Sequence, residues 1–137
     1  MTAQKKSPVD TAVEWIKFAS ENLQVANSTV EHEVPAYHTI CFLCYKSAEK
    51  FLKAYLISNS WELEKTHDPV ELLEYCSDYD KEADLLFEDC SILNDYVIDG
   101  RYPADISFEE IGAKEAKEAK EAIEKAERIK AFVLNEF

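Results

Sequence analysis

The chain has 137 residues, of which 47% are hydrophobic and 12% aromatic, a composition typical of one globular domain and not of a disordered segment. Its net charge of -13 at pH 7 repels a phosphate backbone, which excludes bulk electrostatic binding to DNA and confines any nucleic-acid contact to a local basic patch. Two glycines and four prolines supply too few turns for a multi-stranded sheet, so we expect a single all-α domain over residues 1–137.

The hydropathy pattern and the cysteines indicate a cytoplasmic protein without a cofactor. No stretch reaches the ~18 apolar residues of a membrane span, and the first ten residues lack the apolar core of a signal peptide. We therefore expect the four cysteines to be reduced. Cys41 and Cys44 form a Cys-x-x-Cys, with His38 three residues earlier, but no second ligand pair follows at zinc-site spacing. Core cysteines are thus favoured over a metal site.

The first helix is predicted to begin at Ser7-Pro8, where a capping residue precedes a proline at the first helical position. Apolar residues then recur every three or four positions. They are Val9, Ala12, Ile16, Ala19, Leu23, Ala26 and Val30. Pro35 interrupts this pattern, because proline lacks an amide hydrogen and disfavours a helical conformation in the residue before it. The second helix is expected from about Ala36 to Ser58.

The second helix is apolar around most of its circumference and should be the most buried element. Its helical stepping places His38 and Glu49 on one face, together with Phe42, Tyr45 and Leu52. An adjacent stripe carries three lysines, Lys46, Lys50 and Lys53. The simplest interpretation of this stripe is a solvated helix edge. His38, on a largely apolar helix, is more typical of a hydrogen-bonded core or interface residue than of a ligand.

Three more helices follow. Asp68-Pro69, a cap and then a proline, opens a short third helix that closes within residues 77–80. A fourth spans roughly Lys81 to Ile98, and Gly100 marks its end. A capping-box signature at residues 107–110 precedes a fifth helix that runs to residue 137.

The fifth helix has an apolar seam and a charged outer face. The seam comprises Ala116, Ala119, Ile123, Ala126 and Val133, and the small alanines would let a neighbouring helix approach closely. Four long helices and one short one, joined mostly by brief connectors, predict an up-and-down four-helix bundle with an additional short helix.

Three segments in this order resemble the HEPN domains of prokaryotes. They are AEKFLKAYLI at residues 48–57, THDPVELLE at residues 66–74 and LNDYVIDGRYP at residues 93–103, and the resemblance extends from Trp15 to Phe137. Family members typically carry Cys-x-x-x-Gln-Gln-Ala-Ala-Glu-Lys in the second helix. In this chain the stretch that begins at Cys41 keeps the Ala-Glu-Lys core, but Tyr45 and Lys46 replace the glutamines.

The resemblance implies a bundle that forms a homodimer, often encoded beside a minimal nucleotidyltransferase, with a groove for a nucleotide or RNA. It also implies two subclasses, of which one is a ribonuclease toxin with an arginine followed, after four to six residues, by a histidine. The counterpart of that arginine is Arg101, and the positions that follow it at this spacing hold Ile106, Ser107 and Phe108. None of these side chains titrates near neutrality as histidine does. A non-catalytic HEPN protein is therefore the first expectation.

The candidate nucleotide-binding residues are the cationic, aromatic and hydrogen-bonding side chains of these motifs. They are Lys46, Glu49, Lys50, Lys53, His67, Asp68, Arg101 and Tyr102. The lysines and Arg101 would contact phosphate, Tyr102 would stack on a base, and His67 or Glu49 would hydrogen-bond the base. Structural interpretations stay open beside these roles. Asp68 is a natural helix cap, and Arg101 would fix the long connector by pairing with Glu49 or Asp95.

Two functions remain open from the sequence. The first is a homodimeric binding module that holds a nucleotide or RNA phosphate, or pairs with a nucleotidyltransferase in a toxin-antitoxin-like or regulatory system. A surplus of apolar side chains around the second helix also favours a dimer. The second is a divergent ribonuclease toxin that uses His67 or His38.

Metal catalysis is not expected. Glu64-x-x-His67 resembles half of a di-iron motif, but the second copy of the motif is missing.

Overall fold

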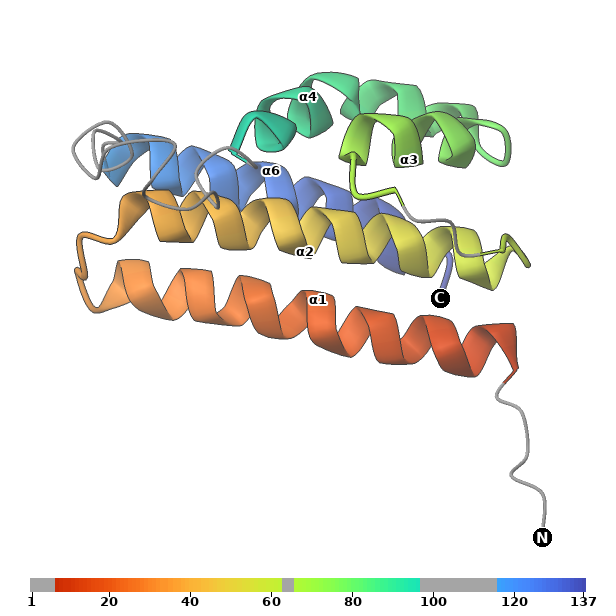
Figure 1. Cartoon of the computed structure of the whole chain (residues 1–137), viewed down its shortest axis with the longest axis horizontal. Helices are drawn as coiled ribbons and strands as arrows, with labels where there is room; N and C mark the ends of the chain where they lie inside the picture. The colour runs from red at the N-terminus through yellow and green to blue at the C-terminus, as the bar shows by residue number, and fades with distance from the viewer. Residues whose placement is uncertain (1–6, 63–65, 97–115) are drawn as a thin grey trace, which may run out of the picture.

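The structure is a computed structural model that describes residues 7–62, 66–96 and 116–137 (Figure 1). Across these three ranges the chain is helical and forms no strand. Its elements are α1 (Pro8–Glu31), α2 (Tyr37–Ser58), α3 (Pro69–Ser77), the 3-10 helix η1 (Lys81–Leu86), α4 (Phe87–Asp95) and α6 (Ala116–Leu134). The prediction of an all-α bundle is confirmed. None of the helices in the described ranges combines the length and the apolar character needed to span a bilayer.

Helix α2 is the central element of the bundle. Figure 1 shows α1, α2 and α6 as three long, roughly aligned helices, with α3 and α4 on the side of α2 opposite α1. Accordingly, α2 contacts α1, α3, α4 and α6. This position agrees with the prediction that the second helix is the most buried one.

Two of the predicted helix starts, at Ser7-Pro8 and at Asp68-Pro69, are confirmed by capping hydrogen bonds. The backbone N–H of Asp10 donates to the hydroxyl of Ser7 over 3.1 Å at the start of α1. At the start of α3 the N–H of Val70 donates to Oδ1 of Asp68 over 2.8 Å. Both caps are followed by a proline at the first helical position, where the missing amide hydrogen costs nothing.

The contact between α1 and α2 is built on small residues. Ala12, Ala19 and Ala26 are spaced by seven residues on α1 and are fully buried. Alanine has no side chain beyond the β-carbon, so the two backbones can approach closely. The hydroxyl of Ser47 on α2 uses this proximity and donates to the carbonyl oxygen of Ala19 over 2.8 Å.

The apolar surface of α2 is largely covered within one chain. Phe51, Leu52 and Leu56 have no exposed surface, while Phe42 and Leu43 are partly buried against the same core. The predicted apolar surplus around this helix is therefore wrong, because α1, α3, α4 and α6 together enclose it. The prediction of a homodimer loses this line of support.

The later helices differ in part from the prediction. The fourth begins as the 3-10 helix η1 and becomes α-helical only at Phe87, and α4 ends at Asp95. In α6, Ala116 is exposed, whereas the rest of the predicted seam is buried. The predicted stop at Gly100 and the capping box at residues 107–110 lie outside the described ranges.

None of the four cysteines forms a disulfide, and all four are buried. Burial is the first cause that raises the pKa of the thiols of Cys44, Cys76 and Cys90. Within the described ranges no three His, Cys, Asp or Glu side chains come together in a way that could hold a metal ion. The cysteines therefore pack as small apolar residues.

Candidate functional site

A buried carboxylate, Glu49, lies at the centre of the polar residues predicted to form the site. Its side chain is only 2% exposed. Lys53 donates to Oε1 over 2.8 Å, and Nδ1 of His67 lies 2.7 Å from the same oxygen. Lys46 donates to Oε2 over 3.3 Å. We call these four residues, together with Lys50, the Glu49 cluster.

The cluster joins residues that are near one another in sequence on α2 with one residue from a separate segment. Lys46 and Lys53 precede and follow Glu49 by three and four residues on α2, a spacing that places side chains on one helix face. His67 comes from the segment before α3. Burial pushes the pKa of Glu49 upward, but hydrogen bonds from Lys53 and His67 and the charges of the two lysines outweigh this effect and lower the pKa. Glu49 is therefore ionised at neutral pH.

The burial of Lys53 contradicts the prediction that the three lysines of α2 form a solvated stripe. Its side chain is 4% exposed, and its ammonium group lies 5.4 Å from the centroid of the Trp15 ring on α1. Glu49 and the indole face together compensate this buried charge. Lys46 and Lys50 are partly exposed, so the stripe runs from solvent into the protein.

Lys50 faces α1. Its ammonium group donates to Oδ1 of Asn22 over 2.7 Å. The pKa of Lys50 is lowered, first by burial and next by the positive charge of Lys46. The lysines of α2 therefore stand close enough to repel one another.

His67 is fixed at both its backbone and its ring. The hydroxyl of Tyr45 donates to the carbonyl oxygen of His67 over 2.8 Å. Nδ1 lies close to Glu49 and 3.1 Å from Lys53 Nζ. A single ring nitrogen either donates to the carboxylate or accepts from the ammonium group, so its tautomer decides which bond forms. The side chain is 64% exposed, which leaves the rest of the imidazole open to solvent.

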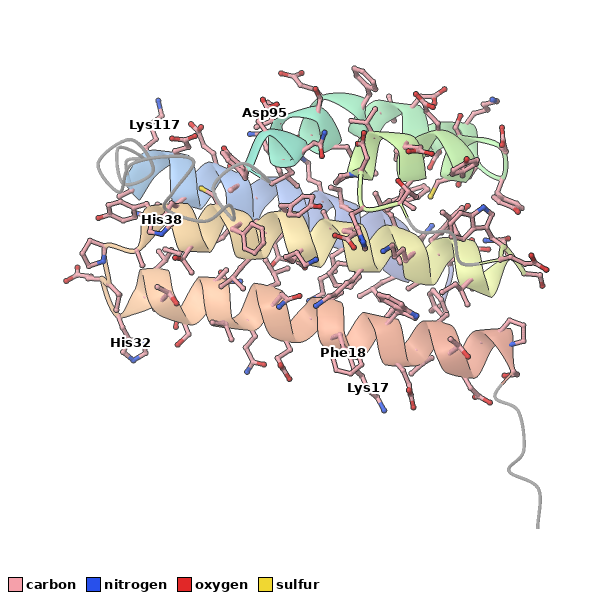
Figure 2. All side chains as sticks on the ribbon, viewed as in Figure 1. Lys17, Phe18, His32, His38, Asp95 and Lys117 are labelled. Atoms are coloured by element: carbon pink, nitrogen blue, oxygen red, sulfur yellow. The ribbon has the colours of Figure 1, made fainter. Side chains whose placement is uncertain are left out.

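The remaining predicted residues fall into three groups. Asp68 is committed to capping α3, so its structural interpretation is confirmed. Arg101 and Tyr102, like Glu64 of the di-iron comparison, lie outside the described ranges. His38 lies near the start of α2, away from the middle of the helix that carries Glu49 (Figure 2). The structure thus brings together Lys46, Glu49, Lys53 and His67.

Sequence reasoning missed the aromatic residues next to this cluster. A surface pocket of about 260 Å³ is lined by Thr11, Glu14, Trp15, Phe18 and Lys50. Trp15 and Phe18 lie off the predicted apolar stripe of α1, and Phe18 is 58% exposed. In Figure 2 Phe18 projects from the middle of α1. Two aromatic side chains outside the core stripe of one helix were the signal that could have revealed this pocket.

Comparison with known proteins identifies the fold family. The crystal structure of TT1696 from Thermus thermophilus is similar over 92% of this chain and 98% of that chain, with 26% identity and a TM-score of 0.77. The structure of ST0689, described as an archaeal HEPN homologue, covers 91% of this chain and 96% of its own, with 27% identity and a TM-score of 0.72. No curated protein sequence matches the chain. The family model for the HEPN domain matches residues 12–136, and the chain therefore belongs to the HEPN domain family.

Proposed function

We propose that this protein is a non-catalytic HEPN module that binds the phosphate of a nucleotide or of RNA at the Glu49 cluster. The supporting observation is the convergence of Lys46, Lys53 and His67 on a single buried carboxylate, with Lys50 one turn from Lys46 on α2. Three lysines and one glutamate leave a local excess of positive charge in a chain whose net charge is -13. Arg101 and Tyr102 belong to the proposed site through the family resemblance alone.

The lowered pKa of Lys50 supports an anion at this position. Burial is the first cause of that lowering and repulsion from the like charge of Lys46 is the second. A bound phosphate would relieve the repulsion because its oxygens accept hydrogen bonds from several ammonium groups at once. Glu49 would meanwhile hold Lys46 and Lys53 in place, which lowers the entropy lost when they bind.

The direct test is isothermal titration of the purified protein with pyrophosphate, ATP, GTP and a short single-stranded RNA. We expect binding that weakens with added salt, and an affinity about tenfold lower for Lys46→Ala, since a hydrogen bond to a charged group contributes about 1.5–3 kcal/mol. Lys117→Ala is the matched control, because Lys117 is also paired with a glutamate on its own helix. Absence of heat with all four ligands would refute the proposal.

We also propose that the protein acts as a homodimer that pairs with a minimal nucleotidyltransferase, as the family resemblance implies. Sedimentation velocity at micromolar concentration would detect the dimer, and a stable monomer would contradict it. Co-expression with a nucleotidyltransferase encoded in the neighbouring gene would test the pairing. Copurification at a fixed stoichiometry is the expected result.

One observation favours a second candidate function, a divergent ribonuclease. His67 has the arrangement of an oriented general base, since a buried carboxylate lies 2.7 Å from its Nδ1 while most of the ring faces solvent. Such a histidine would accept the proton of an RNA 2′-hydroxyl as the 2′-oxygen attacks the adjacent phosphorus. The 5′-oxygen would leave with a proton from water, and the products would be a 2′,3′-cyclic phosphate and a 5′-hydroxyl end.

Incubation of the protein with end-labelled RNA separates the two candidates. A ribonuclease would lose cleavage in His67→Ala and keep it in His32→Ala, which changes an exposed histidine at the end of α1. Arg101→Ala adds a test of the residue that the resemblance implicates. Intact RNA with the unaltered protein, together with measurable binding, is the result expected for the non-catalytic module.

A further inference from the structure

The pocket on α1 adjoins the Glu49 cluster, and Lys50 lines it. Lys53, a member of the cluster, lies against the ring of Trp15, which also lines the pocket. The pocket and the cluster therefore share Lys50 and meet at Trp15, where α1 contacts α2. The shared side is cationic, and the pocket itself is lined by two aromatic rings.

The chemistry of the pocket fits a flat aromatic ligand. Phe18 is 58% exposed, which leaves a ring without the cover that large apolar side chains normally find in a core. Trp15 contributes a second, partly buried ring. Aromatic side chains of this kind stack on nucleobases with little regard to base identity, because every base has a π-face. A volume of about 260 Å³ suits one base.

The cation at the pocket would orient a nucleotide. Lys50 lines the pocket and belongs to the Glu49 cluster, so its ammonium group would attract a phosphate. A nucleotide would consequently direct its phosphate toward Lys50 and the rest of the Glu49 cluster, and its base toward Phe18.

We infer that the pocket formed by Trp15, Phe18 and Lys50 is a base-stacking subsite for the nucleotide unit whose phosphate binds at the Glu49 cluster, an inference that rests on the proposed function. The ligand class is a nucleobase joined through its sugar to a phosphate. It comes either from a free nucleotide or from a single-stranded RNA.

The experiment compares ligands with and without a base. Affinities for pyrophosphate, ribose 5-phosphate, AMP, ATP and a six-nucleotide RNA are measured on the unaltered protein and on Phe18→Ala, Phe18→Leu and Phe18→Tyr. Phe87→Ala is the matched control, because Phe87 is similarly exposed, at 55%, and lies on α4. We expect Phe18→Ala and Phe18→Leu to bind AMP, ATP or RNA roughly tenfold more weakly. Phe18→Tyr, which keeps the ring, should bind as the unaltered protein does.

A second readout uses the fluorescence of Trp15. The chain has two tryptophans, and Trp61→Phe leaves Trp15 as the only one. Trp61 packs on Tyr75 with ring centroids 5.6 Å apart, and phenylalanine preserves an aromatic partner there. AMP should quench the remaining emission, whereas ribose 5-phosphate should not. Quenching by AMP alone, by RNA alone or by both identifies the source of the base.

The outcomes separate this inference from the proposed function. If pyrophosphate binds and weakens in Lys46→Ala, but a base adds no affinity and Phe18→Ala changes nothing, the subsite is refuted and the phosphate site stands. If no phosphate ligand binds, both are refuted. Equal losses for AMP and ribose 5-phosphate in Phe18→Ala would also refute the subsite, because such a loss would not depend on the base.

Discussion

At the scale of single residues, the main feature is the carboxylate of Glu49, which is buried but has hydrogen-bond and ion-pair partners. Removing Glu49 from water is costly, and the structure compensates this with Lys53, Lys46 and His67. The same partners explain why its pKa is lowered despite its burial. Replacing one member of such a group should therefore cost more than replacing both charges together.

The first prediction concerns this pair of opposite charges. Glu49→Gln leaves the ammonium group of Lys53 buried without its carboxylate, and we expect the free energy of unfolding to fall by about 3 kcal/mol. The double change Glu49→Gln with Lys53→Met removes both charges and should recover most of that loss. Urea unfolding followed by circular dichroism measures both. Equal destabilisation by the single and double changes would show that the unpaired charge of Lys53 is not the cause of the loss.

The second prediction concerns acid. A carboxyl whose pKa is lower in the folded than in the unfolded state stabilises the fold above its ordinary value of 4.5. That contribution disappears as the pH falls through the lower, folded pKa. The difference in unfolding free energy between the unaltered protein and Glu49→Gln should therefore be constant near neutrality and shrink below pH 4.5. Urea titrations at several pH values would reveal this, and a difference independent of pH would contradict the lowered pKa.

At the scale of elements, the helix starts were predictable and the pairing of helix faces was not. Ser7-Pro8 and Asp68-Pro69 carry local signals, because a capping hydrogen bond forms within three residues of the cap. The burial of Lys53 depends on Trp15, which lies 38 residues earlier in the sequence. Periodicity within one helix contains no information about which distant side chain will cover it.

Other elements show the same limit. Helical spacing placed Lys46 on a stripe next to the face of Glu49, but it did not predict that Lys46 pairs with Glu49 or that the segment before α3 brings His67 onto Glu49. The helix start at Lys81 was predicted, but its 3-10 geometry was not. Asp80 caps it as it would cap an α-helix, through a 2.9 Å hydrogen bond from the N–H of Glu82, so the local sequence does not separate the two helix types.

The third prediction tests the close contact between α1 and α2. Ala19→Leu inserts three carbon atoms where α1 meets Ser47, and we expect a loss of about 1–3 kcal/mol through overpacking. Gln24→Leu is the control, since Gln24 is exposed on the same helix and should change stability by less than about 0.5 kcal/mol. Thermal unfolding of both variants provides the comparison. Equal stability of the two would show that the helices are less closely packed than described.

At the scale of the whole molecule, the core unites residues from every described helix. The four cysteines are distributed through it, two on α2, one on α3 and one on α4. Burial raises the pKa of Cys90 to about 12 and raises those of Cys44 and Cys76 as well. Since the thiolate is the reactive form, the reactivity of these cysteines reports on the integrity of the entire core.

The fourth prediction follows from this distribution. At pH 8 the folded protein should react with Ellman's reagent only slowly, and all four thiols should react within minutes in concentrated guanidinium chloride. Glu49→Gln should raise the slow rate, because a less stable fold opens more often. Rapid reaction of one thiol in the folded protein would identify a cysteine that is accessible despite its place in the core.

The alanines at positions 12, 19 and 26 have a consequence for the register of α1. An ideal straight helix drifts by about 20° per heptad relative to a strict seven-residue repeat. All three alanines are nevertheless fully buried, because a drift of about 40° over two heptads stays within the roughly 100° that the buried face of an amphipathic helix covers. Each residue of a helix turns the chain by about 100°. One residue inserted between Ala19 and Ala26 would therefore rotate the last turns of α1 and carry Ala26 out of register with its two counterparts.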